Sequence, residues 1–140
     1  MKVPAWMIFG LLISILIMDI TKVMMVRSRI INTVEHSLDA ALVGGVNLEN
    51  EFNGRLYIDE SKGTNYALTL LKSGLKLNDQ LENNNLKDTT FQVSYIQDSE
   101  RPKVSAEIST VITALSTKVV GLEGVPITIR KTQYHLGKFK

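Results

Sequence analysis

The chain of 140 residues contains no cysteine and only 2 histidines. Without cysteine there is no disulfide, no thiolate metal site and no cysteine nucleophile. An excess of charge of one sign is also missing, since 16 Lys and Arg face 14 Asp and Glu, for a formal net charge of +2. This balance excludes a broad electrostatic footprint for nucleic acid.

Motifs that carry catalysis or cofactor binding are missing as well. The sequence contains none of the patterns G-x-x-x-x-G-K-[ST], G-x-G-x-x-G, G-x-S-x-G or H-E-x-x-H. His36 has no second ligand one turn away, and the acidic pair Asp59 and Glu60 suits the start of a helix. We therefore expect no enzyme activity, no metal, no cofactor and no small-molecule substrate.

The most prominent feature that is present is an apolar run without charge over residues 3–18, VPAWMIFGLLISILIM. A membrane-spanning helix needs about 20 mostly apolar residues. Residues 19–26, DITKVMMV, extend the run to that length. No small-residue cleavage site of the A-x-A type follows Met18, which favours a retained helix over a cleaved signal peptide.

The residues expected to contact lipid or neighbouring helices lie on this segment: Trp6, Ile8, Phe9, Leu12, Ile15, Leu16, Ile20 and Val23. Positive residues are more numerous after the run, at Lys22, Arg27 and Arg29, than before it, at Lys2. By the positive-inside rule alone, the C-terminal side would lie in the cytoplasm. We favour an external head, with its orientation set by another signal such as a leader removed ahead of Met1.

Asp19 is the first charged residue after the apolar run. A carboxylate at the edge of an apolar helix is costly unless it is paired. Lys22 follows at i+3 on the same helix face, so the sequence predicts a charge pair between Asp19 and Lys22. Two interpretations stay open: the pair marks the membrane edge, or Asp19 pairs with a basic group on a neighbouring subunit and sets axial register.

Helical periodicity continues beyond the apolar run. Apolar residues recur at steps of three and four: Ile20, Val23, Met24, Ile30, Ile31, Val34, Leu38, Ala41 and Leu42. Gly44 and Gly45 predict the helix break, so we divide the chain into a long helix, residues 1–43, and a head, residues 44–140. Such a helix is about 60 Å long, roughly twice the hydrocarbon core of a bilayer. Its second half is therefore available to pack against the head.

The head is expected to contain one helix and three strands. The helix is predicted over residues 60–77, capped by Asp59 or Ser61. Its apolar face comprises Tyr66, Ala67, Leu70, Leu71 and Leu75. Alternating patterns predict strands over residues 90–97, 103–113 and 126–134, with a short helix or turn over residues 114–120. Short links favour an antiparallel meander, so the fold class is α+β.

This order of elements resembles the type IV pilins and pseudopilins, and most of all the TadE-like proteins of tight-adherence pili. The segment HSLDAALVGGV, residues 36–46, is similar to the small apolar stretch at the end of the long helix in that group. Pilin precursors carry a glycine processing site and a glutamate at the fifth mature position. Cutting after Gly10 would place Ile15 at that position, and Asp19 is the nearest acid.

The resemblance implies a structural subunit of an extracellular filament that polymerises through its hydrophobic helix. Its partners would be further copies of the chain, the membrane before assembly and the pilus assembly machinery. It would lie at the cell surface in an adhesive filament, after a stage in the inner or cytoplasmic membrane. The alternative is a single-pass membrane-anchored accessory protein, a pseudopilin or secretion-complex component, with an extracytoplasmic binding head.

Basic residues near the C-terminus interleave with aromatic ones: Arg130, Lys131, Tyr134, Lys138, Phe139 and Lys140. Such a cluster could contact phosphates. Lysine at an exposed strand end also protects a sheet edge against pairing with other chains. We favour edge protection and do not expect a nucleic-acid partner.

Overall fold

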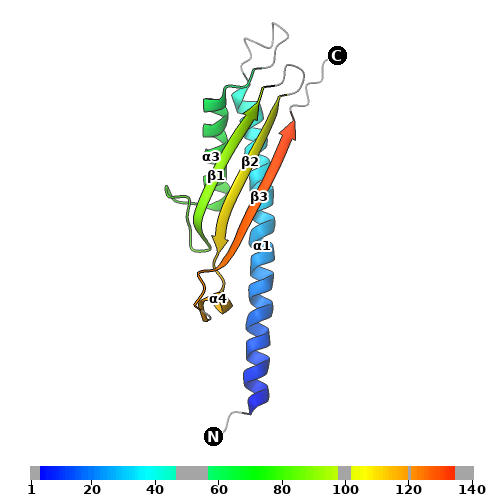
Figure 1. Cartoon of the computed structure of the whole chain (residues 1–140), viewed down its shortest axis with the longest axis vertical. Coiled ribbons are helices and arrows are strands. Elements are labelled where there is room, and N and C mark those ends of the chain that lie inside the picture. The colour runs from blue at the N-terminus through cyan, green and yellow to red at the C-terminus, as the bar shows by residue number, and fades with distance from the viewer. Residues whose placement is uncertain (1–3, 47–56, 98–101, 120, 135–140) are drawn as a thin grey trace.

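The fold is α+β, as predicted, with a long N-terminal helix, a further helix and a three-stranded antiparallel sheet (Figure 1). The computed structural model describes residues 4–46, 57–97, 102–119 and 121–134. In chain order the elements are α1 (Ala5–Gly45), α3 (Glu60–Leu75), β1 (Leu86–Ile96), β2 (Lys103–Ile112), α4 (Leu115–Val119) and β3 (Val125–Tyr134). Among the sequence features singled out above, Lys2, Lys138, Phe139 and Lys140 lie outside the described residues.

Helix α1 is continuous over 41 residues, and Pro4 precedes its first residue. It ends two residues later than predicted, because Gly44 and Gly45 are helical and the chain turns extended only at Val46. Both glycines sit where another element comes close. A Cβ on Gly44 would overlap the Tyr66 ring, and one on Gly45 would lie 2.7 Å from Cγ2 of Ile58. The prediction of a break at Gly44 and Gly45 was therefore wrong by two residues, since these glycines permit close packing and do not cap the helix.

Helix α3 begins where its cap residue predicts. The Asp59 carboxylate accepts a hydrogen bond of 3.1 Å from the backbone N–H of Lys62. The helix ends at Leu75, two residues before the predicted end, because Lys76 adopts a left-handed conformation with φ of 54°. Ala67, Leu71 and Leu75 are buried as predicted, whereas Tyr66 and Leu70 are largely exposed.

The strands pair in the order β1-β2-β3, all antiparallel. Ile108 lies at the centre, opposite Phe91 of β1 and Ile129 of β3. Strand β1 begins at Leu86, four residues earlier than predicted, and its register shifts between Lys87 and Thr90. That irregularity disrupts the alternating pattern in the sequence, which explains the late predicted start.

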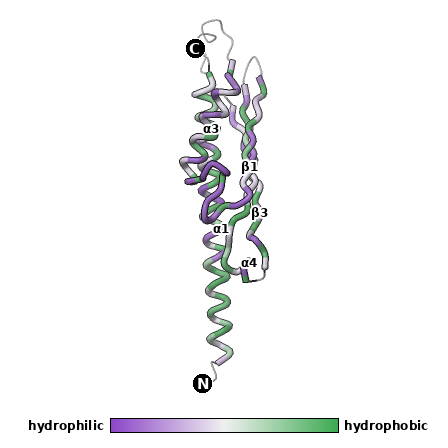
Figure 2. The backbone as a smooth tube through the Cα atoms, turned by 90° about the vertical axis from the view of Figure 1, so that its left-hand side faces the viewer, coloured by the Kyte–Doolittle hydropathy of each residue, from purple (hydrophilic) through white to green (hydrophobic). Residues whose placement is uncertain are grey.

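The molecule has two layers, with α1 and α3 on one side and the sheet on the other (Figure 2). Alternate residues of β2 are buried against the helices: Val104, Ala106, Ile108, Thr110 and Ile112. The opposite face of the sheet carries polar cross-strand pairs, Ser105 with Thr132 and Ser109 with Thr128. One face of this sheet therefore forms a core and the other is polar, as an antiparallel sheet permits.

The second half of α1 belongs to the core of the head. Its buried apolar residues are Ile30, Val34, Leu38, Ala41 and Leu42, and they join one cluster with α3 and the sheet. The Lys131 ammonium of β3 also binds the Glu35 carboxylate of α1 at 2.7 Å. The packed unit therefore begins within α1, well before the sequence-based division at residue 43.

Candidate membrane and assembly surface

The first half of α1 projects beyond the head as an apolar helix (Figures 1 and 2). Trp6 is 85% exposed and Met18 is 72% exposed. Large apolar side chains between them are exposed as well: Met7, Ile8, Phe9, Leu11, Leu12, Ile13, Leu16 and Ile17. Because these residues are consecutive or nearly so, they cover the whole circumference of the helix. We call this segment, residues 5–18, the bare helix.

Helix α1 is, within the described part of the chain, the one helix long and apolar enough to cross a membrane. Of its most hydrophobic window of 18 residues, 6% is buried inside the protein. The core helix of a water-soluble domain would be mostly buried over such a stretch. The length, composition and exposure of α1 therefore favour membrane anchoring.

The residues predicted to contact lipid or other helices divide into two groups. Six of them are exposed: Trp6, Ile8, Phe9, Leu12, Leu16 and Ile20. Ile15 instead lines a cavity beside α4, and Val23 packs against the core of the head. The apolar pattern of the sequence cannot separate these groups, because both obey the same helical periodicity.

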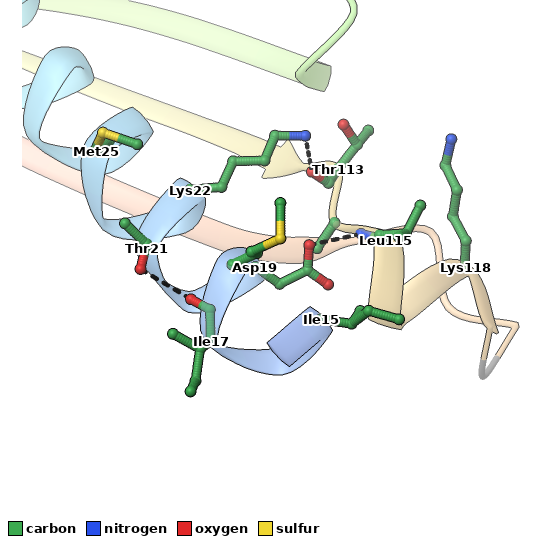
Figure 3. Close-up of a pocket in the computed structure, with 11 residues that line it drawn as sticks. Ile15, Ile17, Asp19, Thr21, Lys22, Met25, Thr113, Leu115 and Lys118 are labelled. Atoms are coloured by element: carbon green, nitrogen blue, oxygen red, sulfur yellow. Dashed lines mark hydrogen bonds between the residues drawn. The ribbon is translucent and has the colours of Figure 1, made fainter. Parts of the chain in front are cut away.

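Asp19 lies at the junction between the bare helix and the head. Its side chain is turned toward the start of α4 (Figure 3), and the residue is only 7% exposed. Its Oδ1 accepts a hydrogen bond of 3.0 Å from the backbone N–H of Leu115. Its Oδ2 accepts one of 2.5 Å from the backbone N–H of Ser116. A carboxylate of α1 thus caps a helix that lies 96 residues further along the chain.

Lys22 binds the same segment as a hydrogen-bond donor, whereas Asp19 binds it as an acceptor. Its ammonium donates a hydrogen bond of 2.9 Å to the backbone carbonyl of Thr113 (Figure 3). No ion pair within 4.0 Å joins Lys22 to Asp19, both of which are described residues. The predicted direct charge pair is therefore replaced by a clasp, in which Asp19 and Lys22 hold Thr113, Leu115 and Ser116 from two sides.

One sequence signal could have revealed this clasp. The first N–H groups of a helix need an acceptor, and the residue before the helix usually supplies it. Ala114 precedes α4 and has no side-chain acceptor. The orphan N–H groups of α4 therefore need an acceptor from elsewhere, and Asp19 provides it.

Apolar grooves flank the clasp on both sides. The larger, of about 540 Å³, is lined from α1 by Ile15, Ile17, Met18, Thr21 and Met25, and from the α4 region by Ala114, Leu115 and Lys118 (Figure 3). The smaller, of about 300 Å³, includes Leu16, Ile20, Met24 and Val125. The head thus meets the bare helix through a narrow polar contact with apolar walls on either side.

Comparison with models of protein families, with curated proteins and with solved structures gave no match. The assignment of a function therefore depends on the geometry of this surface.

Proposed function

We propose that this chain is a structural subunit of a type IV pilin-like extracellular filament that polymerises through the bare helix. The observation that carries the proposal is the division of one continuous helix into two halves. The half that follows Ile30 contributes the buried core of the head, whereas in the described structure nearly all the large apolar side chains that precede Asp19 are exposed. An uncovered apolar helix needs lipid or other apolar helices around it.

The energetics support an exchange between these two surroundings. Burying one large apolar side chain is favourable by about 1.5–3 kcal/mol relative to leaving it exposed to water. Lipid chains and neighbouring helices satisfy this requirement almost equally, so transfer from a membrane to a helix bundle is not opposed by the hydrophobic effect. The bundle would form the core of the filament, and the heads would form its outer shell.

The attachment of the head supports a repeating assembly. Because α1 is continuous and shares a core with α3 and the sheet, each copy would present its bare helix in the same direction relative to its head. A contact between two different surfaces of identical subunits that does not close into a ring generates an open helical filament. A fixed helix direction allows that contact to repeat.

The same surface also suits the alternative function. The bare helix is apolar around its circumference, as expected of a single helix surrounded by lipid. In that case the chain is a membrane-anchored accessory protein whose head binds a component outside the membrane. The two functions predict different locations for the mature protein.

The first experiment is electron microscopy of material sheared from cells that express the chain, with mass spectrometry of any filaments. We expect filaments composed mainly of this chain. A truncated chain of residues 19–140 is the matched control, since it keeps the clasp and the head but lacks the bare helix. Recovery of the full chain only from the membrane fraction would overturn the filament proposal in favour of the accessory protein.

The absence of cysteine permits a second test in the same cells. Ser14→Cys places one thiol on the exposed surface of the bare helix, and Ser94→Cys places one on the exposed surface of β1. Under oxidation we expect disulfide-linked dimers from Ser14→Cys in the sheared material, because neighbouring bare helices lie together in the filament core. Monomeric Ser14→Cys in filaments would contradict packing through the bare helix.

A further inference from the structure

We propose that α4 and the two residues Gly121 and Leu122 form a second contact with the lipid bilayer, beside the bare helix. We call these residues the foot. Its apolar side chains, Leu115, Val119 and Leu122, would enter the interfacial layer of the membrane. This inference rests on the membrane-inserted state of α1 within the proposed function, and it does not depend on whether filaments form.

If the apolar layer begins at Ala5, the length of the bare helix places the foot at the edge of that layer or just inside it. From Ala5 to Asp19 the helix rises about 21 Å, whereas the hydrocarbon core is ~30 Å thick. About 20 residues are needed to cross that core, and counted from Ala5 they reach Met24. Asp19 therefore lies inside or at the edge of the apolar layer. The foot, bonded to Asp19, lies at the same depth.

The apolar side chains of the foot are largely exposed in the described structure. Val119 is 81% exposed, Leu122 is 61% exposed and Leu115 is 59% exposed. No residue of α4 is buried. Three large apolar side chains gathered on one short projection form a patch that requires an apolar partner. A bilayer at this depth supplies one.

The backbone of the foot is suited to a medium that contains little water. The N–H groups of Leu115 and Ser116 donate to Asp19, and the carbonyl of Thr113 accepts from Lys22. The carbonyl of Thr117 accepts from the N–H of Leu122. In the same way the carbonyl of Ala114 accepts from the Thr117 hydroxyl, and that of Lys118 accepts from the N–H of Gly121. Polar backbone groups near lipid must be satisfied internally, and these are.

The charges near the foot favour apolar contact over attraction to anionic lipid. Lys118 lies within α4, and Glu123 follows Leu122, so their formal charges cancel. The Lys118 stem lines the larger groove, from which its ammonium can reach the water layer. The contact is therefore expected with zwitterionic lipids as well as with anionic ones.

The chain contains one tryptophan, Trp6, and this allows a direct test. The full chain is reconstituted in phosphatidylcholine vesicles with or without bromine on the acyl chains, since bromine quenches tryptophan emission on contact. In the Trp6→Phe background, Val119→Trp and Leu122→Trp each report on the foot. Ile96→Trp is the matched control. Ile96 is also an exposed apolar residue, but it lies at the end of β1 that is farther from α4.

Interfacial side chains lie roughly 5–10 Å into the boundary between headgroups and acyl chains, so bromination should remove about half of the emission at positions 119 and 122. The control at position 96 should lose almost none. Equal quenching at positions 96, 119 and 122 would overturn the proposal. A second variant at the foot guards against a local loss of structure at either position.

The unmodified chain separates failure of this inference from failure of membrane insertion. If Trp6 is quenched but positions 119 and 122 are not, the bare helix inserts and the foot does not touch lipid. If Trp6 is not quenched, insertion itself fails and the inference fails with it. Emission at position 119 that is blue-shifted without quenching by bromine would assign the patch to a second copy of the chain, which also overturns the inference.

Discussion

The carboxylate of Asp19 accepts a hydrogen bond from the backbone N–H of Ser116, 97 residues later in the chain. This contact joins the end of the bare helix to the start of α4. The same carboxylate also accepts from Leu115, so one side chain satisfies two N–H groups that Ala114 cannot satisfy. Two oxygen acceptors at the correct spacing are thus required at position 19.

Asp19→Asn should release α4 from α1. The amide of asparagine keeps one oxygen acceptor but turns an NH₂ donor toward a backbone N–H. Hydrogen bonds to a charged group contribute roughly 1.5–3 kcal/mol each, so we expect a loss of about that size at α4. Hydrogen exchange followed by mass spectrometry should show faster exchange over residues 113–119. The core of the head should exchange as before.

Asp39→Asn is the matched control for this variant, because Asp39 is an exposed aspartate on the same helix. It should leave exchange at α4 unchanged. If Asp19→Asn and Asp39→Asn behave alike, the clasp does not stabilise α4.

Gly63→Ala tests the close approach of α3 to its neighbours. A Cβ on Gly63 would lie 2.6 Å from the Tyr95 hydroxyl and 3.0 Å from the backbone carbonyl of Ala41. Alanine gains about 1 kcal/mol of helix propensity over glycine, but overpacking against a backbone atom costs about 1–3 kcal/mol. We expect a net loss of up to about 2 kcal/mol in the free energy of unfolding by urea.

Gly10→Ala is the control, because a Cβ at Gly10 would meet nothing within 4 Å. That variant should be at least as stable as the original chain. Equal stability of the Gly63 and Gly10 variants would show that α3 can shift away from α1 at no cost.

The sequence predicts the fold well where the apolar pattern depends only on the residues of a single helix or strand. The alternating pattern of residues 90–97 correctly predicts a strand, and its apolar residues Phe91, Val93 and Tyr95 pack against the core. Spacing in α3 predicts the buried residues Ala67, Leu71 and Leu75. These periodicities are local, since each residue's face follows from its place in the helix or strand.

The site is less predictable because it depends on contacts between distant segments. Asp19 is recognisable as costly in an apolar helix, but its true partners are backbone N–H groups, which carry no side-chain signal. Lys22 at i+3 is the nearest partner in sequence, yet the carbonyl of Thr113 competes for it successfully. Likewise, the pair Gly44 and Gly45 resembles a helix end in the sequence. The reason for these glycines is the close approach of the Tyr66 ring and the Ile58 side chain, and the residues next to the glycines in sequence do not reveal it.

Truncation should show where the packed unit begins. A fragment of residues 19–140 keeps the clasp and all the core residues of α1, so it should unfold cooperatively on heating. A fragment of residues 44–140 loses five buried apolar residues: Ile30, Val34, Leu38, Ala41 and Leu42. The four residues larger than alanine contribute about 1.5–3 kcal/mol each, so together they are comparable to the ~5–15 kcal/mol stability of a typical domain. The shorter fragment should therefore show no cooperative transition by circular dichroism. A sharp transition in residues 44–140 would mean that the head folds without α1.

Stability should depend on the protonation of Tyr95 at alkaline pH. Burial of the phenol is the largest cause that raises the pKa of Tyr95, and the nearby carboxylates Glu60 and Asp59 raise it further. Its hydroxyl also lies 3.1 Å from that of Thr64, and this hydrogen bond opposes the rise in pKa. An unfolded tyrosine loses its proton near pH 10, at its ordinary pKa of about 10. Between the two pKa values the unfolded chain has released the proton and the folded chain has kept it.

The free energy of unfolding should therefore be unaffected by Tyr95 below about pH 10 and should fall as the pH rises from there through the folded pKa. Lysines titrate in the same range, so the measurement is the difference between the original chain and Tyr95→Phe in urea unfolding at each pH. Below that range the variant should differ by a constant of about 1 kcal/mol for the lost hydrogen bond to Thr64. Within that range the original chain should lose stability faster than the variant. Parallel curves would mean that Tyr95 ionises as easily in the folded head as in the unfolded chain, because a group with equal pKa values in both states cannot change stability with pH.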